Sequence, residues 1–557
     1  MRLIGLALLL FSLPSLSQEG PHKHGSGDVS ETPEFANRFG TVQFDISCKP
    51  AIRADFNNAV ALLHSFEYEE ARAAFVEIGK KDPQCAMVKW GESMSYFHGL
   101  WGEFNAVEGA KAAAEARRIA AENPQTTKRE QAYIAAIGVV FSDEAVKNGQ
   151  KPDTTGFSEP PREIEERYTQ QMADLHKQFP EDREATIFYA LALNISARRS
   201  DKTHANLRQC TALLKPLFET MPNHPGIAHY IIHCNDNPEM AADGLDAARK
   251  YAQIAPASAH ATHMPSHIFS QLGLWDEMVA SNLVSMKTAE TGANANTCEK
   301  VGNALHAMSF LVVALAETGR VTEAREIVRH ALHDRLDVKG GDHCSDESRG
   351  LVLAAYVAET GEWERAKEFQ PESGSGSPIT GVLWLTAGAG AVKTGDSALA
   401  DRAEQELTRI RDARAKMPGQ TSENAAEALR LALAGWKAQN AKQPGEAIVM
   451  LRKASDLQDR LGSNLVIFKP VREMLADLLL QQGKAAEALV EYKATLVRQP
   501  NRFESLYGAG SAAFASGDGA AGKKYFNQLL AFAKGDERRE LADVHARMAQ
   551  NTITAAR

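Results

Sequence analysis

The sequence predicts an all-α fold, a solenoid of antiparallel helix pairs. From Ala51 onward nearly every segment has the periodicity of amphipathic helices, and the alternating pattern of β-strands is scarce. Glycine and proline interrupt these segments at intervals suited to helical hairpins. A chain of 557 residues also exceeds a single hydrophobic core, which favours several domains or a repeat array.

The N-terminus is typical of an exported protein. A charged start is followed by the apolar run Leu3 to Leu13, and Ser15 to Ser17 supplies small residues for signal peptidase. We therefore predict a signal peptide over residues 1–17 and a periplasmic or secreted location. No segment approaches the ~20 apolar residues of a membrane span, so none is expected. Residues 18–40 are polar and contain Gly, Ser and Pro, which predicts a flexible lead-in.

A 34-residue helical repeat is visible in the C-terminal half. In one copy Gly483 ends the first helix, Ala488 lets the second helix approach, Tyr492 packs between them and Pro500 closes the unit. The same glycine-to-alanine step recurs at Gly319 and Ala324, Gly361 and Ala366, and Gly395 and Ala400, with a degenerate copy at Gly517, Gly522 and Phe526. Ala71, Phe75 and Asp82-Pro83 fit the same frame near the N-terminus.

At these residues the chain resembles the tetratricopeptide (TPR) superfamily over most of Ala51 to Phe526. The resemblance implies a TPR-like α-solenoid with a concave surface able to bind a peptide or protein. The segment PESGSGSP, residues 371–378, is typical of a linker. We therefore expect an N-terminal TPR-like helical domain over residues 41–370 and a C-terminal TPR array over residues 379–557.

Histidines are concentrated in the N-terminal part, where seven of the chain's 17 lie between His224 and His306. Two pairs are spaced by four residues, so a helix would place each pair on one face. Neutral imidazoles from neighbouring helices suit copper or zinc. The candidate metal ligands are His229, His233, His260, His263, His267 and His306, with Met264 as a soft ligand and Asp236 as a ligand or an orienting group.

Two prolines predict where these side chains lie. Pro225 and Pro265 each suit the first position of a helix, which places His229 and His233 along one helix and His267 in the first turn of another. His260 and His263 are then expected in the connection before that turn. His306 lies in a helix predicted over residues 303–316. Three separate elements would converge, although buried histidines that hydrogen-bond to backbone are the simpler explanation of each residue alone.

A narrower resemblance is to exported bacterial TPR-repeat proteins whose function is largely unassigned. It spans roughly Phe39 to Phe310 and includes the segments HPGIAHYIIH and HMPSHIF. It implies characteristic positions for His64 and His98, which are possible further ligands if the solenoid curls. It also makes a disulfide between Cys48 and Cys85 plausible.

The chain has six cysteines and no CxxC pair, and an exported protein can form disulfides. Cys210 and Cys234 lie at similar distances from the turn at Met221-Pro222, so antiparallel helices could pair them. Cys234 differs from the residue usual in the related segments, which leaves a thiolate ligand as the alternative.

Composition and motifs leave three functional hypotheses. A net charge of −9 gives no basic surface for nucleic acid, and GxSxG, HExxH and Walker motifs are absent. The first hypothesis is an exported binding scaffold with an embedded histidine-rich metal site. The second is a metal-dependent enzyme, either a copper oxidoreductase or a zinc hydrolase. The third is periplasmic metal sequestration or delivery. The sequence does not decide whether the protein is an enzyme.

Overall fold

The computed structural model describes residues 33–555 except for 144–146, 148–157, 159, 199–200, 292–296, 334–345, 375–377, 417–421, 462–468 and 536. The predicted signal peptide and most of the predicted lead-in lie outside the described residues. The end of the lead-in, expected to be flexible, is the short helix α1 (Pro33–Phe39). Its Phe35 and Phe39 rings contact each other and pack against the main core, which holds this segment in place.

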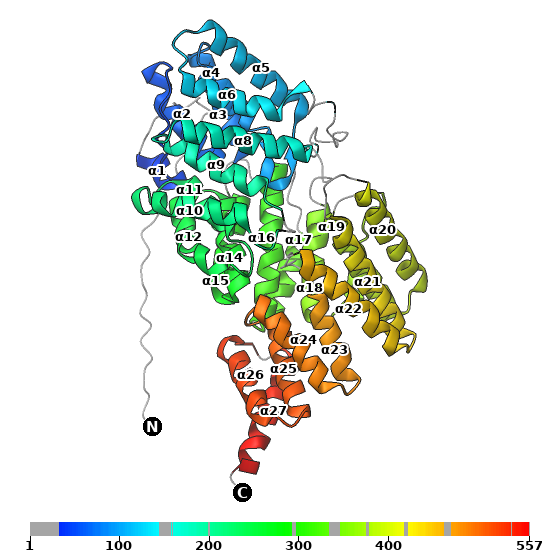
Figure 1. The fold of residues 1–557 in the computed structure, drawn as a ribbon. Helices are drawn as coiled ribbons and strands as arrows, with labels where there is room; N and C mark the ends of the chain where they lie inside the picture. Colours follow the sequence, from blue (N-terminus) through cyan, green and yellow to red (C-terminus); the bar gives the residue numbers. More distant parts are fainter. Residues whose placement is uncertain are drawn as a thin grey trace, which may run out of the picture.

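The described part of the chain is a curved stack of helices (Figure 1). The first helices are η1 (Pro50–Ile52), α2 (Arg53–His64), α3 (Tyr68–Lys81), α4 (Ala86–Met94), η2 (Gly99–Trp101), α5 (Ala106–Glu122), α6 (Lys128–Val140), α8 (Arg162–Gln178) and α9 (Arg183–Ile195). A small antiparallel sheet pairs β1 (Phe97–His98) with β2 (Glu103–Phe104). The middle helices are α10 (Ala205–Thr220), α11 (Pro225–Cys234), α12 (Ala241–Ile254), α13 (Ala259–His263), α14 (Pro265–Leu272), α15 (Trp275–Thr291), α16 (Cys298–Glu317) and α17 (Val321–His333).

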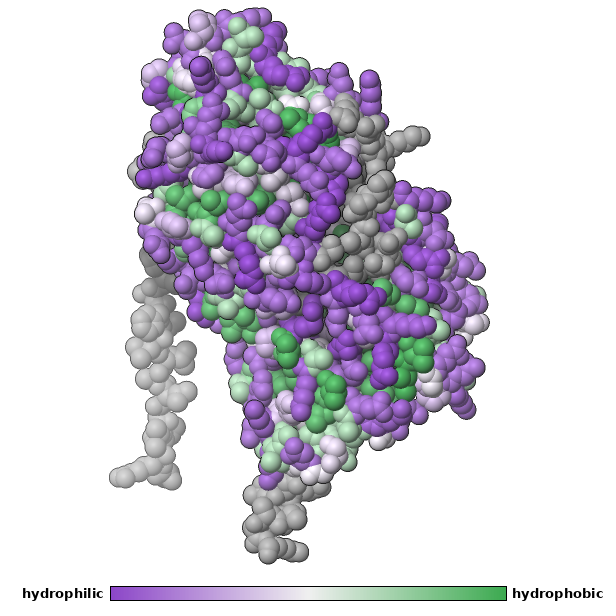
Figure 2. Space-filling view, in the orientation of Figure 1, coloured by the Kyte–Doolittle hydropathy of each residue, from purple (hydrophilic) through white to green (hydrophobic). Residues whose placement is uncertain are grey.

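The C-terminal part continues the same pattern of helix pairs. It comprises α18 (Asp346–Thr360), η4 (Trp363–Glu368), α19 (Pro378–Thr394), α20 (Ser397–Ala415), α21 (Ser422–Asn440), α22 (Pro444–Leu461), α23 (Val471–Gln481), α24 (Ala485–Arg498), α25 (Phe503–Ala515), α26 (Gly519–Phe532) and α27 (Arg539–Ala555). None of the helices in these described ranges is long and apolar enough to cross a membrane. Figure 2 shows a mostly hydrophilic face with hydrophobic residues gathered over the C-terminal helices.

The repeat glycines have one conformation, which confirms the TPR-like solenoid. All five predicted helix-ending glycines have a positive φ between +72° and +88°, namely Gly319, Gly361, Gly395, Gly483 and Gly517. This left-handed conformation ends a helix and is accessible to glycine at little steric cost. In the clearest copy Ala488 and Tyr492 are buried. A β-carbon on Gly508 would lie only 2.2 Å from the Tyr492 ring, so glycine leaves the space that this ring occupies. The copy at Gly361 differs, because the 3₁₀ helix η4 replaces its second α-helix.

Within the described ranges, the buried hydrophobic residues form three clusters. The first extends from Val42 to Ala366, the second from Leu351 to Ala512 and the third from Phe503 to Val544. The first two clusters meet within α18 and η4, just before the predicted linker at residues 371–378.

The C-terminal repeats return to contact the middle of the chain. Trp275 donates its indole N–H to the carbonyl oxygen of Asn501 at 2.7 Å, and the Asn501 amide donates to the carbonyl of Gly273 at 3.2 Å. Gly273 has φ +65°, and a β-carbon there would lie 2.0 Å from the carbonyl oxygen of Pro500. Figure 1 shows α24 and α25 beside the middle helices. This contact therefore requires glycine for both conformation and space.

A buried ionic group strengthens the same junction. The guanidinium of Arg502 pairs with Glu317 at 3.0 Å, with Glu359 at 2.9 Å and with Glu473 at 2.9 Å. Burial outweighs the attraction of Arg502 and raises the pKa of Glu317 to about 8. Because a buried charge is costly without partners, the three carboxyl groups and the guanidinium depend on one another.

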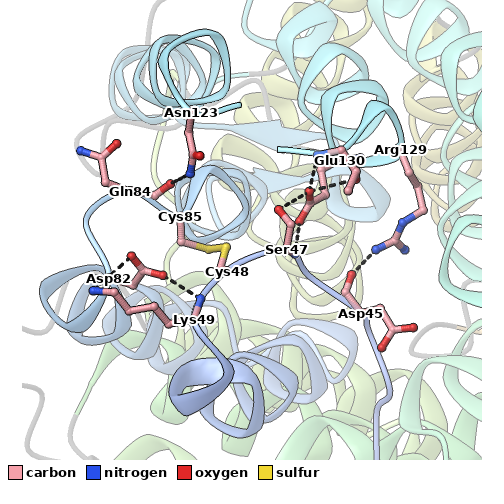
Figure 3. The surroundings of a disulfide bond; sticks show 11 residues. Asp45, Ser47, Cys48, Lys49, Asp82, Gln84, Cys85, Asn123, Arg129 and Glu130 are labelled. Carbon is pink, nitrogen blue, oxygen red and sulfur yellow. Dashed lines mark hydrogen bonds and ion pairs between the residues drawn. A yellow bond between two sulfur atoms is a disulfide. The ribbon is translucent and has the colours of Figure 1, made fainter. Parts of the chain in front are cut away.

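Two described disulfides fix helices of the N-terminal part. Cys48 is bonded to Cys85, as the family resemblance implied, and the preceding Ser47 donates its hydroxyl to Glu130 at 2.6 Å (Figure 3). These contacts anchor the extended segment before α2 to α4 and α6.

The second disulfide joins Cys210 on α10 to Cys234 at the end of α11, which is the pairing suggested by the turn between these helices. Cys234 is therefore not available as a thiolate ligand, and that alternative is removed.

Candidate metal centre

The six histidines lie together in two sets of three. The first trio is His229, His233 and His260, and the second trio is His263, His267 and His306. Within each trio, one nitrogen from each ring lies within 4.8 Å of the other two. The predicted convergence of imidazoles from separate helices is therefore present, and its division into two equal sets was not foreseen.

The first trio is built on α11 and α13. Pro225 occupies the first turn of α11, so His229 and His233 lie one turn apart on the same face. The Nε2 atom of His229 lies 3.1 Å from that of His233 and 3.0 Å from that of His260. Three ring nitrogens thus meet at one point.

The second trio has the same design on α13, α14 and α16. The Nε2 atoms of His263 and His267 are 3.1 Å apart. The ring of His306, from α16, lies 4.4 Å from that of His263 and 6.1 Å from that of His267, measured between centroids. The two trios therefore repeat one arrangement, a pair spaced by four residues and a third ring from another helix.

One detail of the prediction was wrong. His260 and His263, expected in a connecting segment, lie in the five-residue helix α13. Ser258 caps this helix, because its hydroxyl accepts a hydrogen bond from the N–H of Ala261 at 3.0 Å. The sequence signal was present in Ser258, a residue typical of helix N-caps. As a result α13 gives one ligand to each trio.

Hydrogen bonds fix which nitrogen of the first ring in each trio is free. His229 donates from Nδ1 to the carbonyl oxygen of His64 at 2.6 Å. His263 lies with Nδ1 2.7 Å from Oδ1 of Asn282, whose amide nitrogen donates to a backbone carbonyl, so this ring also donates from Nδ1. In both rings Nε2 is left unprotonated, with its lone pair directed at the other histidines.

Asp236 has the orienting role that was one of its two predicted roles. Its carboxylate accepts a hydrogen bond from Nδ1 of His267 at 2.8 Å and another from the Gln271 amide at 3.1 Å. The Nε2 lone pair of His267 is then also free to bind. A carboxylate behind a histidine in this way raises its basicity and orients the ring.

Each trio is covered by one phenylalanine. Phe66 lies 4.3 Å, 5.7 Å and 5.4 Å from the rings of His229, His233 and His260. Phe310, one turn after His306 on α16, lies 4.8 Å, 4.9 Å and 5.2 Å from the three rings of the second trio. Both phenylalanines are buried. The surroundings of the ring nitrogens are thus apolar on one side.

Phe66 has a backbone conformation that is unusual for an aromatic residue. It ends α2 with φ +59°, and Glu67 N–H donates to the carbonyl of Leu62 while Phe66 N–H donates to that of Leu63. This is the C-terminal motif in which glycine normally occupies the left-handed position. A side chain there costs roughly 1–2 kcal/mol. Such strain at a cluster of polar side chains is an indication of function.

Three rings of the trios, those of His229, His260 and His263, are poor bases. Burial, followed by the nearby histidines, lowers the pKa of His229, His260 and His263 well below the ordinary value. These imidazoles are therefore neutral at physiological pH, which is the form that binds metal ions.

The other predicted ligands lie outside both trios. His64 is fully buried and contacts Tyr230 at 2.8 Å and Glu184 at 3.0 Å, so both its ring nitrogens are engaged. His98 stacks on Tyr68 with centroids 4.0 Å apart. Met264 is buried at the junction of α13 and α14.

Glu184 also accepts from the His224 ring, at 2.8 Å. Although burial opposes ionisation, the attraction of His224 and the hydrogen bonds from His224 and His64 lower the pKa of Glu184 to about 2. This group supports α2, whose last residue is His64, and thereby the carbonyl that orients His229.

Three contributors to the site were not predicted, namely Phe66, Phe310 and Asn282. Phe310 and Asn282 were detectable only as helix positions facing α13 and α14, and Phe66 carries no local signal.

Near the first trio, Trp101 has 42% of its surface exposed, and its ring lies 6.0 Å from that of His260.

Fold and site together define a TPR-like helical-repeat protein with a buried histidine cluster. No model of a known protein family matches the sequence, and no curated protein matches it significantly. Among solved structures, the human IFIT1 dimer with PPP-AAAA is similar over 86% of this chain and 90% of that chain, with 13% identity and a TM-score of 0.36. The APC/C hetero-tetramer Cut9-Hcn1 is similar over 88% and 94%, with 10% identity and a TM-score of 0.29. A likeness this weak carries no argument about function.

Proposed function

We propose that this protein is an exported TPR-like metalloprotein whose solenoid holds transition-metal ions on the first and second trios. The observation that carries the proposal is the set of unprotonated Nε2 atoms, fixed by hydrogen bonds from His229, His263 and His267 to oxygen acceptors. The Nε2 atoms of His263 and His267 lie 3.1 Å apart, and because both rings donate from Nδ1 their lone pairs would otherwise face each other. A cation in each trio would satisfy them.

The donor set favours copper or zinc. Each trio offers three imidazole nitrogens and no carboxylate or thiolate, and imidazole suits Cu and Zn whereas Mg, Ca and Mn prefer oxygen. Three protein ligands leave a coordination position for water or a substrate, as in catalytic zinc sites. An enzyme is therefore a natural extension of the metal-binding proposal, and sequestration of the metal is the simpler alternative.

Metal analysis of the purified mature chain tests the proposal. The chain is stripped with chelator, loaded separately with copper and zinc, desalted and analysed by elemental mass spectrometry. We expect two ions per chain, one for each trio, and about one ion in each of His229→Gln and His263→Gln. The exposed His545 on α27 provides the control His545→Ala, which should retain both ions. A folded wild-type chain that retains neither metal would refute the proposal.

Export and partner binding are further parts of this proposal. The N-terminal sequence and the disulfides suit an oxidising compartment such as the periplasm. The C-terminal repeats expose apolar side chains, including Val449 on α22 and Val490 and Val497 on α24, as a peptide or protein ligand would require.

Two measurements test export and partner binding. Fractionation of the native host followed by N-terminal sequencing should find the mature chain outside the cytoplasm, cleaved after residue 17. Cross-linking in cells should recover a partner whose yield falls in Val490→Lys with Val497→Lys and not in His545→Ala. A cytoplasmic, uncleaved chain would remove export, and an unchanged cross-linking pattern would remove the C-terminal repeats as the binding surface.

A further inference from the structure

We propose that the two trios form one dinuclear copper centre that binds dioxygen between its two metal ions. This inference rests on the proposed metal binding and adds the identity of the two ions, their coupling and the ligand that they share. It follows from how close the trios lie, from the chemistry of their donors and from the route by which a small molecule reaches them.

The two trios are too close to act independently. His233 of the first trio and His267 of the second have ring centroids only 6.4 Å apart. His260 and His263 are three residues apart on α13, which separates them by roughly 4.5 Å along the helix axis. With each ion ~2 Å from its ligand nitrogens, rings this close allow two ions at the ~3.5–4 Å separation of paired metal sites.

The trios are also chemically equivalent, which two cooperating ions of one kind require. Each has a histidine pair spaced by four residues, a third histidine from another helix, a first ring whose Nδ1 donates to a buried oxygen, and a covering phenylalanine. A donor set of six imidazoles binds Cu²⁺ more strongly than Zn²⁺ or Fe²⁺ at the same site. Neutral imidazoles and an apolar shell also suit the lower charge of Cu⁺.

A small molecule has access to this centre from one side. His229 and His263 are buried with 0% and 2% of their surface exposed. By contrast, His306 is exposed, and the His267 side chain has 18% of its surface exposed. The centre is therefore most exposed at His306 and His267 of the second trio, and Phe66 and Phe310 give its rings apolar neighbours.

The redox step balances without a further cofactor. Two Cu⁺ ions each give one electron to one dioxygen molecule, which becomes a peroxide bound to two Cu²⁺ ions, and the O–O bond remains intact. No proton is needed for this step. Return to the Cu⁺ state requires two electrons from an external reductant, such as an aromatic diol that is oxidised to a quinone. The two protons that the diol releases convert the peroxide to hydrogen peroxide, which leaves.

The test uses the full mature chain loaded with copper. In the oxidised protein we expect two copper ions per chain and an electron paramagnetic resonance signal far below that of the total copper, because two adjacent Cu²⁺ ions couple. After anaerobic reduction with ascorbate and removal of excess reductant, addition of oxygen should consume one O₂ per two coppers and produce a new near-ultraviolet absorption band.

His306→Gln provides the informative variant, because its exposed side chain makes misfolding a small risk. We expect it to weaken the second ion, restore a Cu²⁺ resonance signal for the first ion and abolish the oxygen-dependent band. The His545→Ala control should behave as the wild type. Two coppers with full, independent resonance signals would overturn the dinuclear centre while leaving metal binding intact. A chain without copper would overturn both proposals.

Discussion

The Nδ1 atom of His229 donates a 2.6 Å hydrogen bond to the carbonyl oxygen of His64. The two residues are 165 positions apart, and this bond joins the end of α2 to the middle of α11. Because it fixes the tautomer of His229, the position of the α2 terminus controls whether this ring presents a free Nε2 to the first trio.

A substitution at Gly226 tests the connection between the end of α2 and His229. A β-carbon at Gly226 would lie 2.5 Å from Nδ1 of His64, so Gly226→Ala should displace that ring and the carbonyl beside it. We expect a loss of ~1–3 kcal/mol in the free energy of unfolding, measured with urea, and weaker metal binding at the first trio. The matched control is Gly302→Ala on α16, where a β-carbon meets nothing within 4 Å. It should be neutral or stabilising by ~0.4–1 kcal/mol, and equal effects of the two changes would contradict the connection.

The stability of the metal-free protein should fall in acid. Burial holds the pKa of His229, His260 and His263 well below that of an unfolded chain, which is ~6.5. The unfolded state therefore binds more protons as the pH falls below about 6.5, and stability that is complete above this pH is lost below it. Each ring contributes at most ~1.4 kcal/mol per pH unit.

Urea unfolding at pH 7.5 and pH 5.5 measures this dependence. Replacement of all three rings by glutamine should flatten the difference between the two pH values. A wild-type protein that is equally stable at both would show that the rings are not neutral and buried.

Asp236→Asn should weaken the second trio selectively. The variant keeps an oxygen that can accept from His267 but loses the negative charge behind the ring. Removal of such a partner typically lowers metal affinity ~10- to 100-fold. Competition with a chromogenic chelator measures both sites. Asp243→Asn is the control, since Asp243 is exposed and pairs with Lys215 at 2.8 Å; a similar loss in both variants would argue against a role for Asp236.

Substitutions at Phe66 separate the effect of its strained backbone from the effect of its ring contacts with the first trio. Phe66→Gly and Phe66→Ala both remove the ring that covers the first trio, but only glycine relieves the backbone at φ +59°. The glycine variant should be more stable than the alanine variant by about 1 kcal/mol. Both should bind the first metal ion less tightly than the wild type. If alanine is as stable as glycine, the left-handed conformation at residue 66 costs nothing.

The disulfide between Cys210 and Cys234 should support the first trio. It closes a loop of 24 residues, and removal of such a bond costs ~3 kcal/mol. Because Cys234 follows His233 directly, replacing both cysteines by serine should also loosen α11 and reduce metal binding there. The paired change at Cys48 and Cys85, away from both trios, should lower stability without altering the metal affinity.

The sequence predicted the solenoid because its determinants are local. A glycine that ends a helix, an alanine that permits close approach and an aromatic that packs are each fixed by position within the repeat, as Gly483, Ala488 and Tyr492 illustrate. The spacing of His229 and His233 predicted that their rings lie on one face for the same reason, since both residues belong to one helix.

The division into trios was not predictable in this way. It depends on α13 lying between α11 and α16, which is a property of the packed chain and not of any spacing. His64 illustrates the limit most clearly: its ring is held by Glu184 and Tyr230, while its backbone carbonyl accepts a hydrogen bond from His229 of the first trio. A sequence pattern does not distinguish a side-chain role from a main-chain role. Whether the trios hold metal stays a prediction.

The junction between the middle and C-terminal helices limits how the number of repeats can change in evolution. It consists of the contact of Gly273 with Pro500 and Asn501 and of Arg502 buried among three glutamates. Open solenoids tolerate the gain or loss of a unit, because each unit touches only its neighbours. Here the array closes back on itself, so one added helix pair between α17 and α24 would carry Arg502 away from Glu317. Relatives that preserve this closure should therefore differ in loop length and surface, and keep the same number of intervening units.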